Sequence, residues 1–128
     1  MEIRTRRIYD PPTARDGTRI LVDDLWPRGM SKEKARLNGW WRTLAPSKAL
    51  RQWFAHDSSR WEGFKERYFA ELDAKQEVLS ALAETPGDGP LTLLFAARDP
   101  AHNNTVALRE YLLRASKRAV EEIGEEPE

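Results

Sequence analysis

The chain has 128 residues, in which 21 Lys and Arg balance 21 Asp and Glu, and it contains no cysteine. This length is typical of one domain, and the lack of cysteine excludes disulfides, Cys-ligated zinc or iron–sulfur centres and thiolate nucleophiles. No apolar run approaches the roughly 18 residues of a membrane span, and the first residues lack a signal-peptide pattern, so we expect a cytoplasmic protein without membrane contact.

Three segments have the character of β-strands. Residues 3–9 are charged and alternate only loosely, which is typical of an edge strand, and residues 19–23 contain the apolar run Ile20-Leu21-Val22. Residues 91–96 are apolar in both alternations, which predicts a strand that is covered on both faces of its sheet.

Helices are predicted through the middle and at the end of the chain. Ser47 is a candidate N-cap, and Ser59-Arg60-Trp61-Glu62 is a capping-box pattern. Further helices are expected over residues 76–83 and from about Asn104 onward. On the first two helices, spacing predicts an inward-facing apolar stripe, formed by Trp53, Phe54, Trp61, Phe64, Tyr68 and Leu72.

The order of these elements predicts an α/β fold. Residues 24–90, which connect the second and third strands, are enough for a parallel crossover and too many for a hairpin. We therefore expect a small, mainly parallel three-stranded sheet with packed helices, a Rossmann-like sandwich, in a single domain over residues 1–120. Residues 121–128 are acidic and are expected to fray.

In parallel α/β sheets, ligands bind beyond the carboxyl ends of the strands. This rule selects the loops at residues 9–12, 23–29 and 97–104. The candidate catalytic residues in these loops are Asp23, Asp99 and His102. The candidate ligand-binding residues are Trp26, Arg28, Arg98 and Asn103, together with Arg7 from the first strand.

The first functional hypothesis is an enzyme, or an enzyme-like binder, that takes a small anionic metabolite or nucleotide. Arginine suits this role because its planar guanidinium grips an oxyanion with two hydrogen bonds. Trp26 would stack on the ligand, and Asp23 or His102 would act as general base. The anion itself would be held by Arg7, Arg28 and Arg98.

The charge distribution agrees with a small anionic ligand. Residues 1–60 hold 13 Lys and Arg against 7 Asp and Glu, whereas residues 61–128 hold 8 against 14. The overall balance argues against a nucleic-acid partner, while the basic half suits a small anion. A purely structural interpretation is also open, in which the two halves attract each other, Asn103 caps the last helix and Arg98 pairs with Asp99.

Two other functional classes are open. His56 and His102, with one of Asp23, Asp57 or Asp99, could form a two-histidine, one-carboxylate metal site, although no local histidine spacing supports one. No other cofactor is predicted. Alternatively, the helical middle could be a non-catalytic interaction module for a protein partner. Nothing in the sequence predicts the oligomeric state.

The selected loops resemble those of the YeaO-like family of uncharacterised bacterial proteins, the domain of unknown function 488. The resemblance rests on Tyr-Asp-Pro-Pro at 9–12, Leu-Trp-Pro-Arg-Gly at 25–29, His56-Asp57, Ala-Ala-Arg-Asp at 96–99 and His102-Asn103. It implies a small cytoplasmic α/β protein and no settled reaction. Asp24 departs from the pattern of the family it resembles, which usually has Arg there. This change would weaken an anion site or alter its ligand, unless the side chain points to solvent.

Overall fold

One parallel sheet forms the centre of the computed structural model, which describes residues 2–83 and 89–124, with the side chains of residues 2–80 and 89–115. In sheet order, its strands are β1 (Ile3–Arg7), β4 (Leu91–Phe95), β2 (Thr18–Leu21) and β3 (Gly39–Trp40). β4 pairs in parallel with both β1 and β2. The predicted parallel pairing of the second and third sequence-derived strands is therefore confirmed, as is the edge position of the first.

The prediction of three strands is wrong, because β3 adds a fourth strand to the described part of the sheet. Ile20 lies opposite Gly39, and Leu21 lies opposite Trp40. A Cβ atom on Gly39 would come within 2.9 Å of Ile20 Cδ1, so glycine allows the two strands to approach. Two residues are too few to produce an alternating pattern, which is why the sequence did not reveal this strand.

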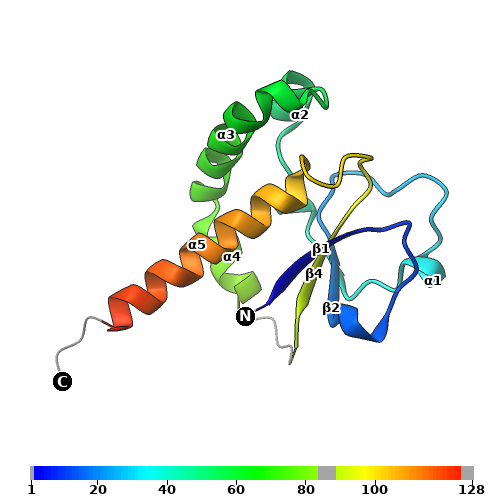
Figure 1. Cartoon of the computed structure of the whole chain (residues 1–128), viewed down its shortest axis with the longest axis horizontal. Coiled ribbons are helices and arrows are strands. Elements are labelled where there is room, and N and C mark those ends of the chain that lie inside the picture. Colours follow the sequence, from blue (N-terminus) through cyan, green and yellow to red (C-terminus); the bar gives the residue numbers. More distant parts are fainter. Residues whose placement is uncertain (1, 84–88, 125–128) are drawn as a thin grey trace.

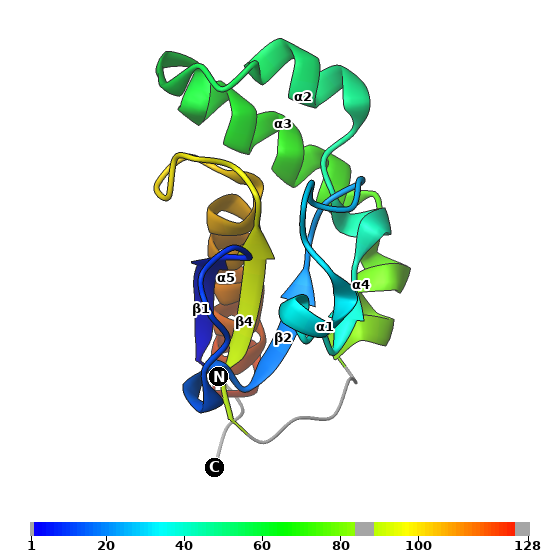
Figure 2. The same cartoon turned by 90° about the vertical axis from the view of Figure 1, so that its right-hand side faces the viewer.

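Helices cover the two faces of the sheet unequally. α5 lies along one face, while α2 and α3 cross above the carboxyl ends of the strands (Figures 1 and 2). The other face is covered by the four-residue α1 and its flanking loop. The α/β class is confirmed, but the Rossmann-like sandwich is not. The helices are α1 (Lys32–Ala35), α2 (Lys48–Phe54), α3 (Trp61–Asp73), α4 (Gln76–Ala83) and α5 (Asn104–Gly124).

Two apolar clusters hold these layers together. The smaller cluster, on the α1 side, consists of Ile8, Leu21, Ala35 and Leu94. The larger cluster joins the other face of the sheet to α2, α3 and α5, and each large side chain buried there contributes about 1.5–3 kcal/mol. Of the predicted inward stripe, this cluster buries Phe54, Phe64, Tyr68 and Leu72, whereas Trp53 and Trp61 are only partly buried.

A buried ion-pair network fixes the start of β2. Asp16 is 1% exposed and pairs with Arg19 at 2.5 Å and with Arg6 at 2.9 Å. Burial alone would raise the pKa of Asp16, but hydrogen bonds from the Thr13 N–H, Arg6 and Arg19 outweigh it and lower the pKa to about 2. Arg19 also donates to the Ala35 carbonyl. The network thus links β1, β2 and α1.

α5 continues four residues into the segment that was expected to fray, since it ends at Gly124. The remainder of that segment, residues 125–128, lies outside the described residues. No helix in the described ranges is long and apolar enough to cross a membrane.

Candidate functional site

A pocket of about 390 Å³ lies at the carboxyl edge of the sheet. Its walls come from the segments that follow β2 and β4, from the start of α5, and from α2 and α3, which cross above that edge. We call it the edge pocket. Its polar lining residues are Asp23, Arg51, His56, His102, Asn103 and Asn104, and its apolar ones are Pro46, Phe54, Phe64, Ala96 and Ala97.

Asp23 follows β2 and lies half-buried in the wall of the edge pocket. Burial raises the pKa of its carboxyl group to about 6, against the opposing effects of the Arg51 charge and of a hydrogen bond from the Ala96 N–H. The neighbouring Asp24 charge raises the pKa further. Asp23 can therefore gain or lose a proton near neutral pH, as a general acid or base must.

His102 is oriented by Asp99. Asp99 Oδ2 lies 2.8 Å from His102 Nδ1, while Asp99 Oδ1 accepts the Ala101 and His102 N–H groups at 2.8 and 3.2 Å. The Ala101 N–H and the His102 ring lower the pKa of Asp99, so it stays ionised. Because Nδ1 is engaged, Nε2 is the ring nitrogen available to a molecule in the edge pocket.

The two asparagines after this histidine have structural partners. Asn103 is 3% exposed, and its Oδ1 accepts the N–H groups of Thr105 and Val106 at the start of α5. This is the helix cap that the structural interpretation expected. Asn104 donates from Nδ2 to the Val22 carbonyl and so ties α5 to the end of β2.

Arg51, from α2, is a lining residue that the sequence did not reveal. Its Nη2 donates to Asp24 Oδ2 at 3.1 Å, so Asp24 holds this arginine. Arg51 Nε is buried and has no hydrogen-bond acceptor among the described residues. Only the crossing of α2 above the sheet brings Arg51 to the pocket, and no local sequence signal reports that crossing.

Four of the predicted ligand-binding residues lie outside the lining of the edge pocket. Arg7 donates to the Ala97 carbonyl at 3.3 Å and stacks on Tyr9. Trp26 donates from Nε1 to the Met30 carbonyl, four residues further on, and so closes its own turn. The other two, Arg28 and Arg98, are exposed, and neither pairs with a carboxylate in the part of the chain that the structure describes.

The sequence-predicted metal site is not formed. His56 and His102 both line the edge pocket, but residues 2–83 and 89–124 contain no group of three or more His, Asp or Glu side chains that could hold a metal ion. Asp57 caps the short helix Ser58–Arg60 by accepting the Ser59 N–H at 3.0 Å. Asp99 is engaged with His102.

The fold and the pocket define a small parallel α/β protein with a polar site at the carboxyl edge of its sheet. The chain belongs to the family of the domain of unknown function 488: the family description "Inactive DUF488-N3 subclade" matches residues 2–127. The YeaO-like resemblance is thereby confirmed.

Bacterial relatives extend over nearly the whole chain. The "Uncharacterized protein YeaO" of Escherichia coli strain K12 is 38% identical over 112 residues, covering 88% of this chain and 97% of the relative. The "Uncharacterized protein Rv3073c" of Mycobacterium tuberculosis strain H37Rv is 34% identical over 110 residues, covering 86% of this chain and 92% of the relative. No solved structure gives a significant match to the chain.

Proposed function

We propose that the protein binds a small anionic metabolite or nucleotide in the edge pocket and does not turn it over. Arg51 provides the observation that carries this proposal. Its Nε is buried in the pocket wall, and no described residue accepts a hydrogen bond from it. A buried donor left unpaired lowers the stability of the fold by about 1–3 kcal/mol. An oxyanion would supply the missing acceptor.

The other polar groups of the edge pocket favour the same ligand chemistry. His102, held by Asp99, offers Nε2, and His56 lies in the same wall. Asp23 is the one carboxylate among the described lining residues. Since burial raises the pKa of Asp23 to about 6, its protonated form can donate to an anion, whereas its ionised form repels one.

Binding without turnover is favoured by the family description, which contains the word "Inactive". A histidine oriented by a carboxylate is also an arrangement that hydrolytic enzymes use, so the geometry alone suits either role. The pocket volume of about 390 Å³ is in the range of sites for small molecules.

Thermal unfolding with sulfate, succinate and AMP at pH 6 tests the proposal. A ligand at about 100 times its Kd stabilises the folded protein by roughly 2.7 kcal/mol. We expect at least one probe to raise the Tm of the wild type but not of Arg51→Gln or His102→Gln. Arg98→Gln is the matched control, because Arg98 is exposed and outside the pocket lining.

The pH dependence provides a second test of the same site. Sulfate keeps its charge over this range, so weaker sulfate binding at pH 7.5 than at pH 5.5 would report protein groups alone. We expect Asp23→Asn to reduce this pH dependence. The proposal is wrong if no probe shifts the Tm, or if the Arg51 and Arg98 variants respond alike.

A further inference from the structure

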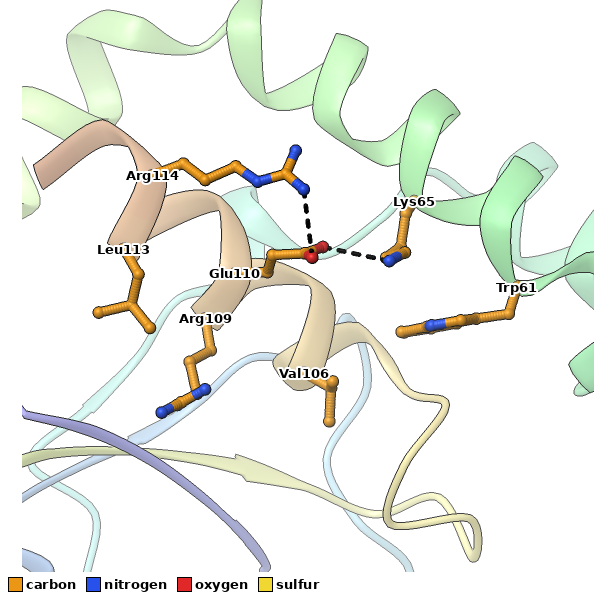
Figure 3. Close-up of a pocket in the computed structure, with 7 residues that line it drawn as sticks. All are labelled: Trp61, Lys65, Val106, Arg109, Glu110, Leu113 and Arg114. Atoms are coloured by element: carbon orange, nitrogen blue, oxygen red, sulfur yellow. Dashed lines mark hydrogen bonds and ion pairs between the residues drawn. The ribbon is translucent and has the colours of Figure 1, made fainter. Parts of the chain in front are cut away.

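A second hollow, of about 360 Å³, lies between α3 and α5. We call it the α3–α5 groove. It shares no lining residue with the edge pocket, and Trp61, in its wall, meets the His102 ring edge-on at 5.3 Å. Its apolar lining residues are Trp61, Val106 and Leu113, and its charged ones are Lys65, Arg109, Glu110 and Arg114 (Figure 3).

The charges in the α3–α5 groove do not balance. The lining residues include three cations and one carboxylate, that of Glu110, and outside the lining Lys65 also approaches Glu62. Glu110 lies between two of the cations, 3.4 Å from Lys65 Nζ and 3.3 Å from Arg114 Nη2 (Figure 3). Arg109 donates to the Ile3 carbonyl and pairs with no described carboxylate. The groove therefore carries an excess of positive charge, which favours an anion over a cation.

The ammonium group of Lys65 is held loosely by the carboxylates beside it. The Lys65 side chain is only 17% exposed and its ammonium approaches Glu62 and Glu110 at 3.4 Å. These distances are longer than the roughly 2.7–2.9 Å of a good charge-assisted hydrogen bond. Glu110 Oε2 is buried and accepts no hydrogen bond from a described residue. Lys65 can therefore still donate a hydrogen bond to an acceptor on a bound molecule, whereas Glu110, whose unpaired oxygen would repel an anion, opposes that binding.

The apolar walls restrict what that molecule is. Trp61 and Lys65 lie on α3, whereas Val106 and Leu113 lie on α5 and form the opposite side of the groove (Figure 3). A fully hydrated inorganic ion would gain nothing from these surfaces, whereas an apolar chain loses contact with water there. The volume lies at the lower end of the range for small-molecule sites, which limits the size of the ligand.

We propose that the α3–α5 groove binds a small amphipathic anion, an aliphatic or aromatic carboxylate. Its carboxylate accepts hydrogen bonds from Lys65 and from a neighbouring arginine, and its apolar part lies on Trp61 and Val106. This site is independent of the ligand proposed for the edge pocket. The competing interpretation is a set of ordinary ion pairs between two helices, with water bridging Lys65 and Glu110.

Titration calorimetry with three probes separates these interpretations. Hexanoate has the proposed chemistry, hexylamine has the same chain with the opposite charge, and acetate has the head group alone. We expect hexanoate to bind at least fivefold more tightly than either of the others. Equal affinity for hexanoate and hexylamine would overturn the proposal.

Variants assign the binding to this groove. Lys65→Met keeps the length of the side chain but removes the ammonium, and we expect it to weaken hexanoate binding at least fivefold. Lys48→Met is the matched control, because Lys48 is exposed and outside the groove. Arg114→Gln gives a second variant at a largely exposed side chain, where misfolding is not a concern; we expect a weaker but measurable loss.

Removal of the Glu110 carboxylate should have the opposite effect on the affinity for hexanoate. Glu110→Gln leaves the cations without their competing partner, so we expect hexanoate to bind more tightly than to the wild type. Unchanged affinity in Lys65→Met and Arg114→Gln, or weaker affinity in Glu110→Gln, would contradict the proposal.

Discussion

The half-buried position of Asp23 lowers the stability of the folded protein when its carboxyl group is ionised. Its carboxyl group is half-buried after β2, and burial raises its pKa from 3.8 to about 6. A raised folded-state pKa means that the neutral form is favoured by folding. The contribution of the neutral Asp23 carboxyl group to stability is complete below pH 3.8 and is lost as the pH rises through about 6. Residues at functional sites commonly lower the stability of the folded protein in this way.

We therefore expect Asp23→Asn to stabilise the protein by roughly 1–3 kcal/mol at pH 7.5. The asparagine Oδ1 can still accept the Ala96 N–H, but it has no charge to desolvate. Urea unfolding at pH 7.5 and pH 4 measures the effect, and the gain should shrink at pH 4, where Asp23 is already protonated. A variant that is less stable than the wild type at pH 7.5 would show that the ionised carboxylate is a net stabilising group.

Some individual residues of the candidate site could be predicted from the sequence. Asp23 and His102 follow strands whose parallel pairing could be inferred, so the edge of the sheet at which they lie was predictable. Arg51 was missed because it reaches the pocket from α2, through packing that is not encoded locally. Arg28 and Arg98 have the right residue type in the right loops, but both are exposed and neither lines the pocket.

The elements β1, β2 and α1 are joined by one buried carboxylate, Asp16, through Arg6 and Arg19. Arg19 is 4% exposed, so loss of its partner would leave a guanidinium buried without a counter-charge. We expect Asp16→Asn to destabilise the protein by about 3–5 kcal/mol, the usual cost of breaking a buried pair from one side.

Glu2→Gln is the control for this effect, because the Arg4–Glu2 pair is exposed and should contribute little to stability. Urea unfolding at pH 7 compares the two variants. Since the pKa of Asp16 is lowered to about 2, its contribution is present above pH 4 and is lost as the pH falls through 2. Similar losses in both variants would contradict a special role for Asp16.

Elements with long periodic patterns were predictable. The helix capped by Ser47, the helix that begins at Trp61 and the apolar strand at residues 91–95 were all recognisable. The capping box predicted at Ser59 is not formed, because Ser59 lies in the preceding short helix and no side chain caps the helix at Trp61. β3 was not recognisable, because its two residues pair with β2 through backbone hydrogen bonds that any sequence can form.

In the whole molecule, aromatic side chains join α2 to α3 within the larger apolar cluster, which also contains residues of the sheet and of α5. Phe64 is 2% exposed, and its ring lies 4.6 Å from Phe54, 5.6 Å from Trp61 and 5.6 Å from Tyr68. It also lines the edge pocket. Phe64 thus belongs both to the core and to the wall of the candidate site, so packing and ligand binding depend on the same side chain.

Truncation of this ring tests how far the crossing helices stabilise the fold. We expect Phe64→Ala to destabilise the protein by about 3–5 kcal/mol, because it removes a buried ring and leaves a cavity. Phe64→Leu should cost less than about 1.5 kcal/mol, since leucine refills most of that space. Urea unfolding at pH 7 measures both losses, and the urea dependence of the unfolding free energy should stay constant if the molecule unfolds as one unit. A loss below about 1 kcal/mol for Phe64→Ala would mean that α2 and α3 rest on the sheet without stabilising it, and that the edge pocket has a movable wall.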